Sequence, residues 1–218
     1  MGKKFVGSFS TGKDSTLAIY KAIEMGYEPH KLIITYNTKA EKAWFHGVES
    51  EIIDMFSDSL KIPVELVKTD GDDYEEAFEE ALKKCREEGC EVCVYGDIDI
   101  ENHLKWGIER CENAGVEPVF PLWQRNREDV VREFIDQGFK TVITTINIKK
   151  MNPAYLGRIL DIGLLEELRG EGIDVCGENG EYHTLVVDGP LFAYPLKLEF
   201  SEERAGDYAR LTAKAAER

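Results

Sequence analysis

Residues 10–15 (STGKDS) form a run of small and polar side chains between an apolar segment and an amphipathic one. Where a helix begins, unpaired backbone N–H groups and the positive end of the helix dipole can together bind a polyphosphate. Gly12 would let the backbone approach such a ligand closely, and Lys13 would add a full positive charge. The hydroxyl groups of Ser10 and Ser15 would add hydrogen-bond donors. This segment therefore predicts a loop that holds the phosphates of a nucleotide.

Two kinds of phosphate-binding loop compete for this segment. Gly7, Gly12 and Lys13 match the beginning of a Walker A loop, in which the next residue is a Ser or Thr that binds magnesium. Asp14 stands there instead, and its carboxylate would repel phosphates unless it held a metal ion or lay outside the cradle. We therefore name Asp14 as the candidate metal ligand. The segment also resembles the PP-loop of N-type ATP pyrophosphatases, usually written SGGKDS, with Thr11 in place of a glycine.

A helix start that merely caps itself with Ser or Asp is the plainer alternative. It does not explain why Gly12 and Lys13 stand in a loop between a strand and a helix. We therefore predict that residues 10–15 bind ATP. As a loop residue, Lys13 is expected at the surface, so that Lys13→Ala should weaken ATP use with little loss of fold stability.

Residues 176–184 (CGENGEYHT) are the second dense polar motif. The glycines at 177 and 180 favour a tight turn, and Glu178, Glu181 and His183 could converge on one spot. Taken alone, the motif is better explained as a solvent-exposed acidic turn that leads into a strand at 182–187.

Strand-like and helix-like segments alternate through the first half of the chain. The apolar runs typical of strands lie at 4–9, 31–36, 64–67, 91–95 and 116–120. Between them, apolar residues recur at helical spacing within 15–25, 48–60, 77–85 and 104–111. This alternation predicts an α/β fold, a Rossmann-like parallel sheet with helices on both faces.

Polar residues follow two of these predicted strands, at the sheet edge where ligands usually bind. Thr35, Tyr36 and Asn37 end the second strand and are candidates for contact with adenine or ribose, although a polar strand terminus explains them equally well. Gly96 and Asp97 end the fourth strand on the same edge. We expect them to contact nucleotide or substrate, because a glycine there permits close approach.

The pattern changes after residue 121. A helix-like segment at 128–137, a β-branched strand at 141–146, a short helix near 164–168 and a Gly-rich stretch at 170–180 follow one another. We predict an ATP-binding domain over residues 1–121 and a smaller α+β substrate-binding domain over 122–200. Residues 201–218 are expected to be a charged tail, either a surface helix or disordered.

Composition limits the classes of partner. The chain has 218 residues, of which 43% are hydrophobic, and its formal net charge of −15 disfavours nucleic acid as a partner. No apolar stretch approaches a membrane span, so no membrane partner is expected. Five cysteines without a secretion signal predict reduced thiols and a cytoplasmic location. Cys90 and Cys93 lack a second pair at zinc spacing, and we expect Cys93 to be buried as a small hydrophobe.

Together, the two motifs resemble those of the diphthine–ammonia ligase family, including the related PP-loop ATP pyrophosphatases. The resemblance covers nearly the whole chain from residue 10 to residue 192. It includes the segments 44–47 (WFHG), 95–98 (YGDI) and 121–123 (PLW) besides the two motifs.

The resemblance implies an adenylating ligase that uses ATP and Mg²⁺. A substrate carboxylate would attack the α-phosphate and release pyrophosphate, and free ammonia would then displace AMP to leave an amide. The family's substrate is diphthine, a modified histidine of elongation factor 2 that carries a trimethylammonium group. Glu178 and Glu181 would suit that cation, and Tyr182 or Trp44 could add cation–π contacts.

The candidate catalytic residues are Lys13, Asp14, Glu178, Glu181 and His183. An acyl acceptor must lie close to the α-phosphate, so we expect the 176–184 turn to face residues 10–15 across a cleft between the domains. Another PP-loop enzyme, such as one that modifies tRNA, and a nucleotide-binding module without turnover remain as alternatives. A homodimer is also left open.

Overall fold

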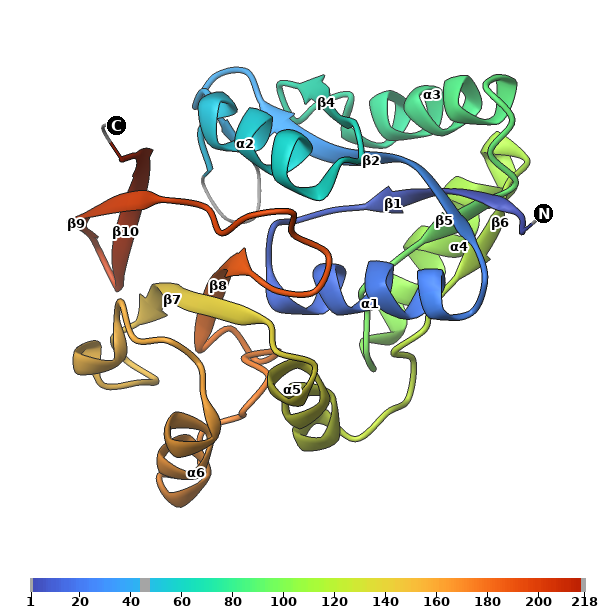
Figure 1. The fold of residues 1–218 in the computed structure, drawn as a ribbon. Helices are drawn as coiled ribbons and strands as arrows, with labels where there is room; N and C mark the ends of the chain where they lie inside the picture. Colours follow the sequence, from blue (N-terminus) through green and yellow to red (C-terminus); the bar gives the residue numbers. More distant parts are fainter. Residues whose placement is uncertain (1, 44–47, 217–218) are drawn as a thin grey trace.

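The computed structural model describes residues 2–43 and 48–216 and contains two β-sheets (Figure 1). The strands of the first sheet are β1 (Lys4–Ser8), β2 (Glu28–Asn37), β3 (Lys42–Ala43), β4 (Val64–Thr69), β5 (Val92–Val94) and β6 (Glu117–Val119). Their order is β3-β2-β1-β5-β6, with β4 also paired to β2, and every pair except β2–β3 is parallel.

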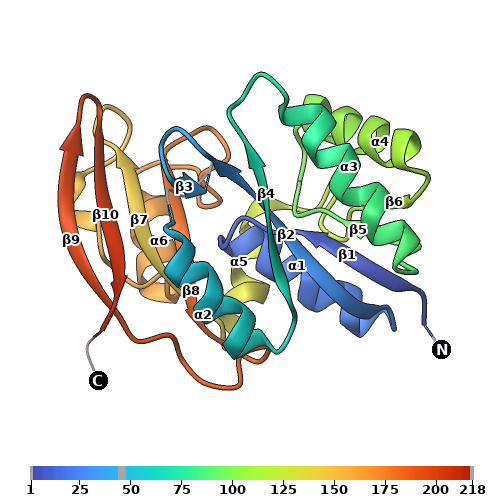
Figure 2. The same cartoon turned by 90° about the horizontal axis from the view of Figure 1, so that it is seen from above.

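Helices cover both faces of this sheet, as the alternating pattern predicts. They are α1 (Lys13–Glu24), α2 (Ser50–Leu60), α3 (Tyr74–Glu87) and α4 (Glu101–Ala114). Successive residues of β1 point to opposite faces: Phe5 packs in the apolar cluster that includes α1 and α2, and Val6 packs in the one that includes α3 and α4. Figure 2 shows α3 and α4 together at one end of the molecule. The expected α/β class is therefore confirmed.

The second sheet is antiparallel and has the order β8-β7-β10-β9. Its strands are β7 (Lys140–Asn147), β8 (Tyr182–Asp188), β9 (Leu198–Ala205) and β10 (Tyr208–Ala215). The 3-10 turn η1 (Pro153–Tyr155) and the helices α5 (Arg127–Asp136) and α6 (Ile162–Gly170) belong to the same half of the chain. Leu17 of α1, Phe134 of α5 and Leu185 of β8 share one apolar cluster, so the two halves have a common core.

The expected charged tail is wrong for residues 201–215. They form most of the β9–β10 hairpin, and β10 pairs with β7 as well as with β9. Ala209 is buried, and Leu198 and Ala213 pack against the core. Inward residues of β10 such as Ala209 and Ala213 are small, and Arg210 and Lys214 follow them in the sequence, so the segment resembles a charged, Ala-rich tail. The predicted domain ranges stay a prediction.

No helix in the described ranges 2–43 and 48–216 is both long and apolar enough to cross a membrane.

Candidate functional site

The loop between β1 and α1 is closed by its own hydroxyl groups. The side-chain oxygens of Ser10 and Ser15 lie 3.0 Å apart, and the backbone N–H of Ser10 donates to Ser15 Oγ at 3.2 Å. Ser15 Oγ also donates to the carbonyl of Gly12, the residue that precedes α1, at 3.2 Å. The loop is therefore folded tightly around the first turn of the helix, the geometry expected of a phosphate cradle.

Thr11 occupies the glycine position of the PP-loop pattern and keeps a glycine-like conformation. Its φ angle is 67°, in the left-handed region that a β-branched residue rarely adopts. Its side chain is buried, and its Oγ1 has no hydrogen-bond partner among the described residues. Its carbonyl accepts a hydrogen bond from the backbone N–H of Val186 in β8 at 2.9 Å. The strained residue therefore joins the loop to the second sheet.

Lys13 is not the surface lysine expected from its place in a loop. It is 4% exposed, because β8 and the turn before it cover the start of α1. Its ammonium group lies 2.7 Å from Asp14 Oδ2, donates to the carbonyl of Cys176 and lies 5.6 Å from the centre of the Tyr182 ring. Its backbone N–H donates to Thr184 Oγ1 at 3.1 Å. One residue thus connects the two sequence motifs.

A cavity of about 480 Å³ lies between the two halves of the chain. One side is formed by the β1–α1 loop, and the other by the 176–184 turn and the beginning of β8. Expected site residues that line it are Ser10, Lys13, Asp14, Ser15, Thr35, Gly96, Asp97, Glu178 and His183. The predicted meeting of the two motifs is thereby confirmed for Glu178 and His183.

Five of the expected residues lie outside the lining of the cavity: Thr11, Gly12, Tyr36, Asn37 and Glu181. Tyr36 packs against the core, and Asn37 accepts hydrogen bonds from the backbone N–H groups of residues 39 and 40. Glu181 is buried, and its Oε2 has no hydrogen-bond partner within the part of the chain that the structure describes. Direct contact of these residues with ligand stays a prediction. Trp44 lies outside the described residues, as does the rest of the 44–47 segment.

Gly96 permits a close approach between backbone segments. A Cβ atom built there would lie 2.6 Å from the backbone nitrogen of Ser15 and 2.8 Å from the carbonyl carbon of Asp14. The backbone just after β5 thus packs directly against the backbone at the start of α1. A side chain at residue 96 would separate the two elements that bring Asp14 and Asp97 to the same cavity.

The cavity carries an excess of negative charge. Burial raises the pKa of Asp14 even though Lys13 opposes the shift. Burial, assisted by the charge of Asp14, raises the pKa of Glu178 to about 7, while Lys13 and Arg127 act in the opposite direction. Burial alone would lower the pKa of Lys13, but the charge of Asp14 and other nearby groups holds it above its ordinary value. Glu178 therefore changes charge near neutrality while Lys13 stays cationic.

His183 is neutral at neutral pH, because burial and the charge of Lys13 lower its pKa. Tyr182 also lines the cavity, but the residue is only 3% exposed and its ring lies near the Lys13 ammonium, so its contact with a ligand cation stays a prediction. The strand β8 therefore contributes an uncharged imidazole and a largely buried aromatic ring to the cavity.

A wall of aromatic residues was missed by sequence reasoning. Tyr74 and Phe78 of α3 and Trp106 of α4 line the cavity, with the Phe78 and Trp106 ring centres 4.9 Å apart. The hydroxyl of Tyr74 lies 3.1 Å from Thr35 Oγ1 at the end of β2. The i, i+4 spacing of Tyr74 and Phe78 was the available signal, but it also fits ordinary packing of a helix on a sheet.

His103 is not among the expected site residues, yet it lines the cavity. Its Nδ1 lies 3.1 Å from Asp97 Oδ1, and this hydrogen bond raises the pKa of the imidazole against the effect of burial. The pair brings a proton carrier to the acidic end of the cavity.

No group of three or more His, Cys, Asp or Glu residues within 2–43 and 48–216 is arranged to hold a metal ion without further ligands. Asp14 Oδ1, however, is buried and has no hydrogen-bond partner in those ranges. Magnesium is commonly held by one or two carboxylates together with substrate phosphates. The oxygen of Asp14 fits that pattern.

The fold and the cavity define an α/β nucleotide-binding protein of the PP-loop class. The chain belongs to the diphthamide synthase family: residues 3–118 match the diphthamide synthase N-terminal domain, and residues 126–212 match the diphthamide synthase C-terminal domain. The two matches together include both sequence motifs.

Relatives named diphthine–ammonia ligase are similar along most of this chain. The human protein is 27% identical over an aligned length of 223 residues, and the alignment covers 88% of this chain and 82% of the relative. The zebrafish (Danio rerio) protein is 23% identical over 234 residues, covering 91% and 88%. Among solved structures, a predicted subunit of a tRNA methyltransferase from Methanocaldococcus jannaschii aligns with a TM-score of 0.47 and 13% identity, covering 86% of this chain and 97% of that one.

Proposed function

We propose that this protein is an ATP-dependent diphthine–ammonia ligase. Its substrates are ATP, ammonia and the carboxylate of diphthine on the elongation factor, and its products are the amide, AMP and pyrophosphate. The observation that carries the proposal is a cavity lined by the PP-loop on one side and by the 176–184 turn on the other. Family membership supplies the reaction class, and the cavity supplies a place where both substrates can meet.

The reaction proceeds in two steps. The substrate carboxylate attacks the α-phosphorus of ATP, and the bond to the β-phosphate oxygen breaks to release pyrophosphate. Ammonia then attacks the carbonyl carbon of the acyl-adenylate, loses a proton and expels AMP. Both steps require the acceptor to be held against the α-phosphate, so a cavity shared by two protein segments is the arrangement the chemistry needs.

Three regions of the cavity suit different parts of the substrates. The phosphates bind at the start of α1, where Ser10, Ser15 and Lys13 stand. The adenine base stacks on the aromatic wall of α3 and α4, near Thr35. The carboxylates of Asp97 and Glu178 favour a cationic group, either ammonium or the trimethylammonium of diphthine.

Asp14 is the proposed ligand of Mg²⁺, because its buried Oδ1 lacks a hydrogen-bond partner among the described residues and faces the same cavity as the PP-loop. When bound, the ion would neutralise phosphate charge and orient the pyrophosphate leaving group. Without a cation, the carboxylates of the cavity would repel ATP. The proposed location is the cytoplasm, which agrees with five cysteines that form no disulfide.

The test is an amidation assay with diphthine-bearing elongation factor, ATP, Mg²⁺ and ammonium. We expect amide formation with AMP and pyrophosphate in equal amounts, and a loss of about a hundredfold or more in Lys13→Ala. Lys149→Ala, which removes an exposed lysine paired with Asp207, serves as the matched control and should keep full activity. Release of ADP and phosphate, or turnover by Lys13→Ala at the control rate, would contradict the proposal.

A further inference from the structure

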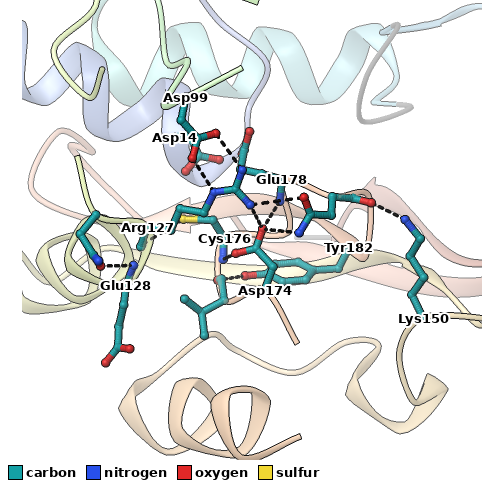
Figure 3. A network of polar contacts seen from close by, with 12 residues as sticks. Asp14, Asp99, Arg127, Glu128, Lys150, Asp174, Cys176, Glu178 and Tyr182 are labelled. Atoms are coloured by element: carbon teal, nitrogen blue, oxygen red, sulfur yellow. Dashed lines mark hydrogen bonds and ion pairs between the residues drawn. The ribbon is translucent and has the colours of Figure 1, made fainter. Parts of the chain in front are cut away.

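Arg127 lies between two loops that both contribute residues to the cavity. It is the first residue of α5, and Figure 3 shows its guanidinium group between Asp99 and Asp174. Its Nε and Nη2 each donate to a carboxylate oxygen of Asp99 at 2.7 Å. Its Nη1 donates to Asp174 and, at 3.4 Å, to Asn179 Oδ1. One side chain therefore connects the loop after β5 with the turn that precedes β8.

Asp174 in turn organises the backbone of the second motif. Its Oδ1 accepts a hydrogen bond from the N–H of Cys176 at 3.1 Å, and its Oδ2 accepts one from the N–H of Glu178 at 3.0 Å. Oδ2 also accepts from the side-chain amide of Asn179 at 3.3 Å. The side chain of Asp174 is only 10% exposed, so the positive charge of Arg127 is what balances its buried carboxylate.

The two connected loops carry residues that face each other in the cavity. Asp97 and Ile100 flank Asp99 and line one part of it. Cys176 and Glu178 line the other part, and the carbonyl of Cys176 accepts the hydrogen bond from Lys13. Arg127 itself is absent from the lining, so it acts on the cavity only through the loops it holds.

A surface salt bridge between flexible side chains would contribute little. The Arg127 contacts differ in geometry, because the pairing with Asp99 is bidentate and the same guanidinium also binds Asp174. The backbone is held too, since the thiol of Cys176 donates to the carbonyl of Arg127 at 3.0 Å. Replacing the guanidinium would leave two carboxylates close together without their shared cation.

We propose that Arg127 is a positioning residue that locks the 174–180 turn to the loop after β5 and so holds Glu178 and the Cys176 carbonyl opposite Lys13 and Asp14. The kinetic part of this inference rests on the proposed function. Loss of Arg127 leaves the PP-loop and the aromatic wall in place, so ATP binding is retained. The turn that holds the acceptor is displaced, so amide formation slows.

The test compares Arg127→Gln with Arg158→Gln, which removes a similar bidentate pair with Glu167 at the exposed surface. For Arg127→Gln we expect kcat for amidation to fall about tenfold or more, with the Kd for ATP changed less than about threefold. Arg158→Gln should match the unsubstituted protein in both. Unchanged kcat in Arg127→Gln, or an equal loss of ATP affinity and kcat, would overturn the proposal.

A second measurement does not depend on the reaction. Hydrogen exchange of the Glu178 amide, which is bonded to Asp174, should be about tenfold faster in Arg127→Gln than in Arg158→Gln, with exchange in β1 and α1 unchanged. Asp99→Asn should give an effect in the same direction, because it weakens the other end of the link. Equal Glu178 exchange in all variants would refute the lock even if amidation were observed. Faster exchange in a protein that forms no amide would refute only the ligase assignment.

Discussion

At the scale of single residues, the PP-loop shows how much a motif leaves undetermined. The types and order of residues 10–15 predicted a phosphate-binding loop, and the structure places that loop at the cavity. The same motif led to the expectation of an exposed Lys13, which is buried. The covering strand β8 lies about 170 residues away in the sequence, and a local pattern carries no information about such a partner.

Because Lys13 is buried, Lys13→Ala is expected to reduce the stability of the fold as well as activity, since the Asp14 carboxylate loses its cationic partner.

Thr11 permits a prediction about backbone strain. A residue with a Cβ atom pays roughly 1–2 kcal/mol in the left-handed region, and glycine does not. At residue 11, where φ is 67°, Thr11→Gly should therefore be more stable than Thr11→Ala. At an ordinary helical position the order is reversed, and Ala81→Gly in α3 should lose roughly 0.5–1 kcal/mol. Urea unfolding of the three variants measures these differences, and an Ala variant at 11 that exceeds the Gly variant would show that the residue is not strained.

At the scale of elements, the first sheet was predictable and the second only in part. Buried parallel strands such as β1 and β5 are short, largely apolar runs, and the helices between the strands show regular apolar spacing. Both signals can be recognised within a short stretch of sequence. The β9–β10 hairpin was missed because its buried positions are filled by alanine and isolated larger residues. The aromatic wall was missed because α3 and α4 meet only through tertiary packing, and a helix face covering a sheet resembles one lining a cavity.

The packing of β5 on α1 gives a prediction at this scale. Gly96→Ala should cost roughly 1–3 kcal/mol, because the new methyl group would meet the backbone of Asp14 and Ser15, which cannot move as a side chain can. Gly170→Ala at the end of α6 is the matched control: no atom lies within 4 Å of its added Cβ, so its stability should be unchanged or slightly higher. The midpoints of urea unfolding measure this difference in stability, and equal midpoints for the two variants would contradict the close packing. ATP affinity should fall with Gly96→Ala alone.

At the scale of the whole molecule, the site exists because two halves of the chain share one core. Lys13 donates to groups on both sides of the cavity, and Arg127 joins loops from both halves. The meeting of the two motifs could be predicted from the chemistry of ligation, since the acceptor must reach the α-phosphate. The electrostatic cost of bringing the two motifs together could not be predicted from the sequence, because it depends on how deeply the charged side chains are buried. Asp14, Asp97 and Glu178 are brought together in a partly desolvated cavity, where like charges destabilise the fold.

The repulsion between these carboxylates predicts how the stability of the fold depends on pH. The pKa of Glu178 is about 7 in the folded protein and about 4.5 in an unfolded chain, so the folded state holds its proton more tightly. The stabilisation from this proton is complete below the unfolded pKa and is lost as the pH rises through 7. Glu178→Gln keeps a neutral side chain at every pH. Its stability advantage should therefore grow between about pH 4.5 and pH 7 and then level off, reaching up to roughly 3 kcal/mol.

Urea unfolding at pH 5, 6, 7 and 8, without ATP or Mg²⁺, tests this dependence. Glu167→Gln is the control of opposite sign, because the hydrogen bond with Arg158 lowers the pKa of the Glu167 carboxylate and the glutamine should gain nothing as the pH rises. A Glu178→Gln advantage that stays constant from pH 5 to pH 8 would mean that Glu178 does not titrate near neutrality. Adding Mg²⁺ without ATP should shrink the advantage at pH 8, because a cation bound at Asp14 offsets the negative charge that Asp14 and Asp97 impose on Glu178.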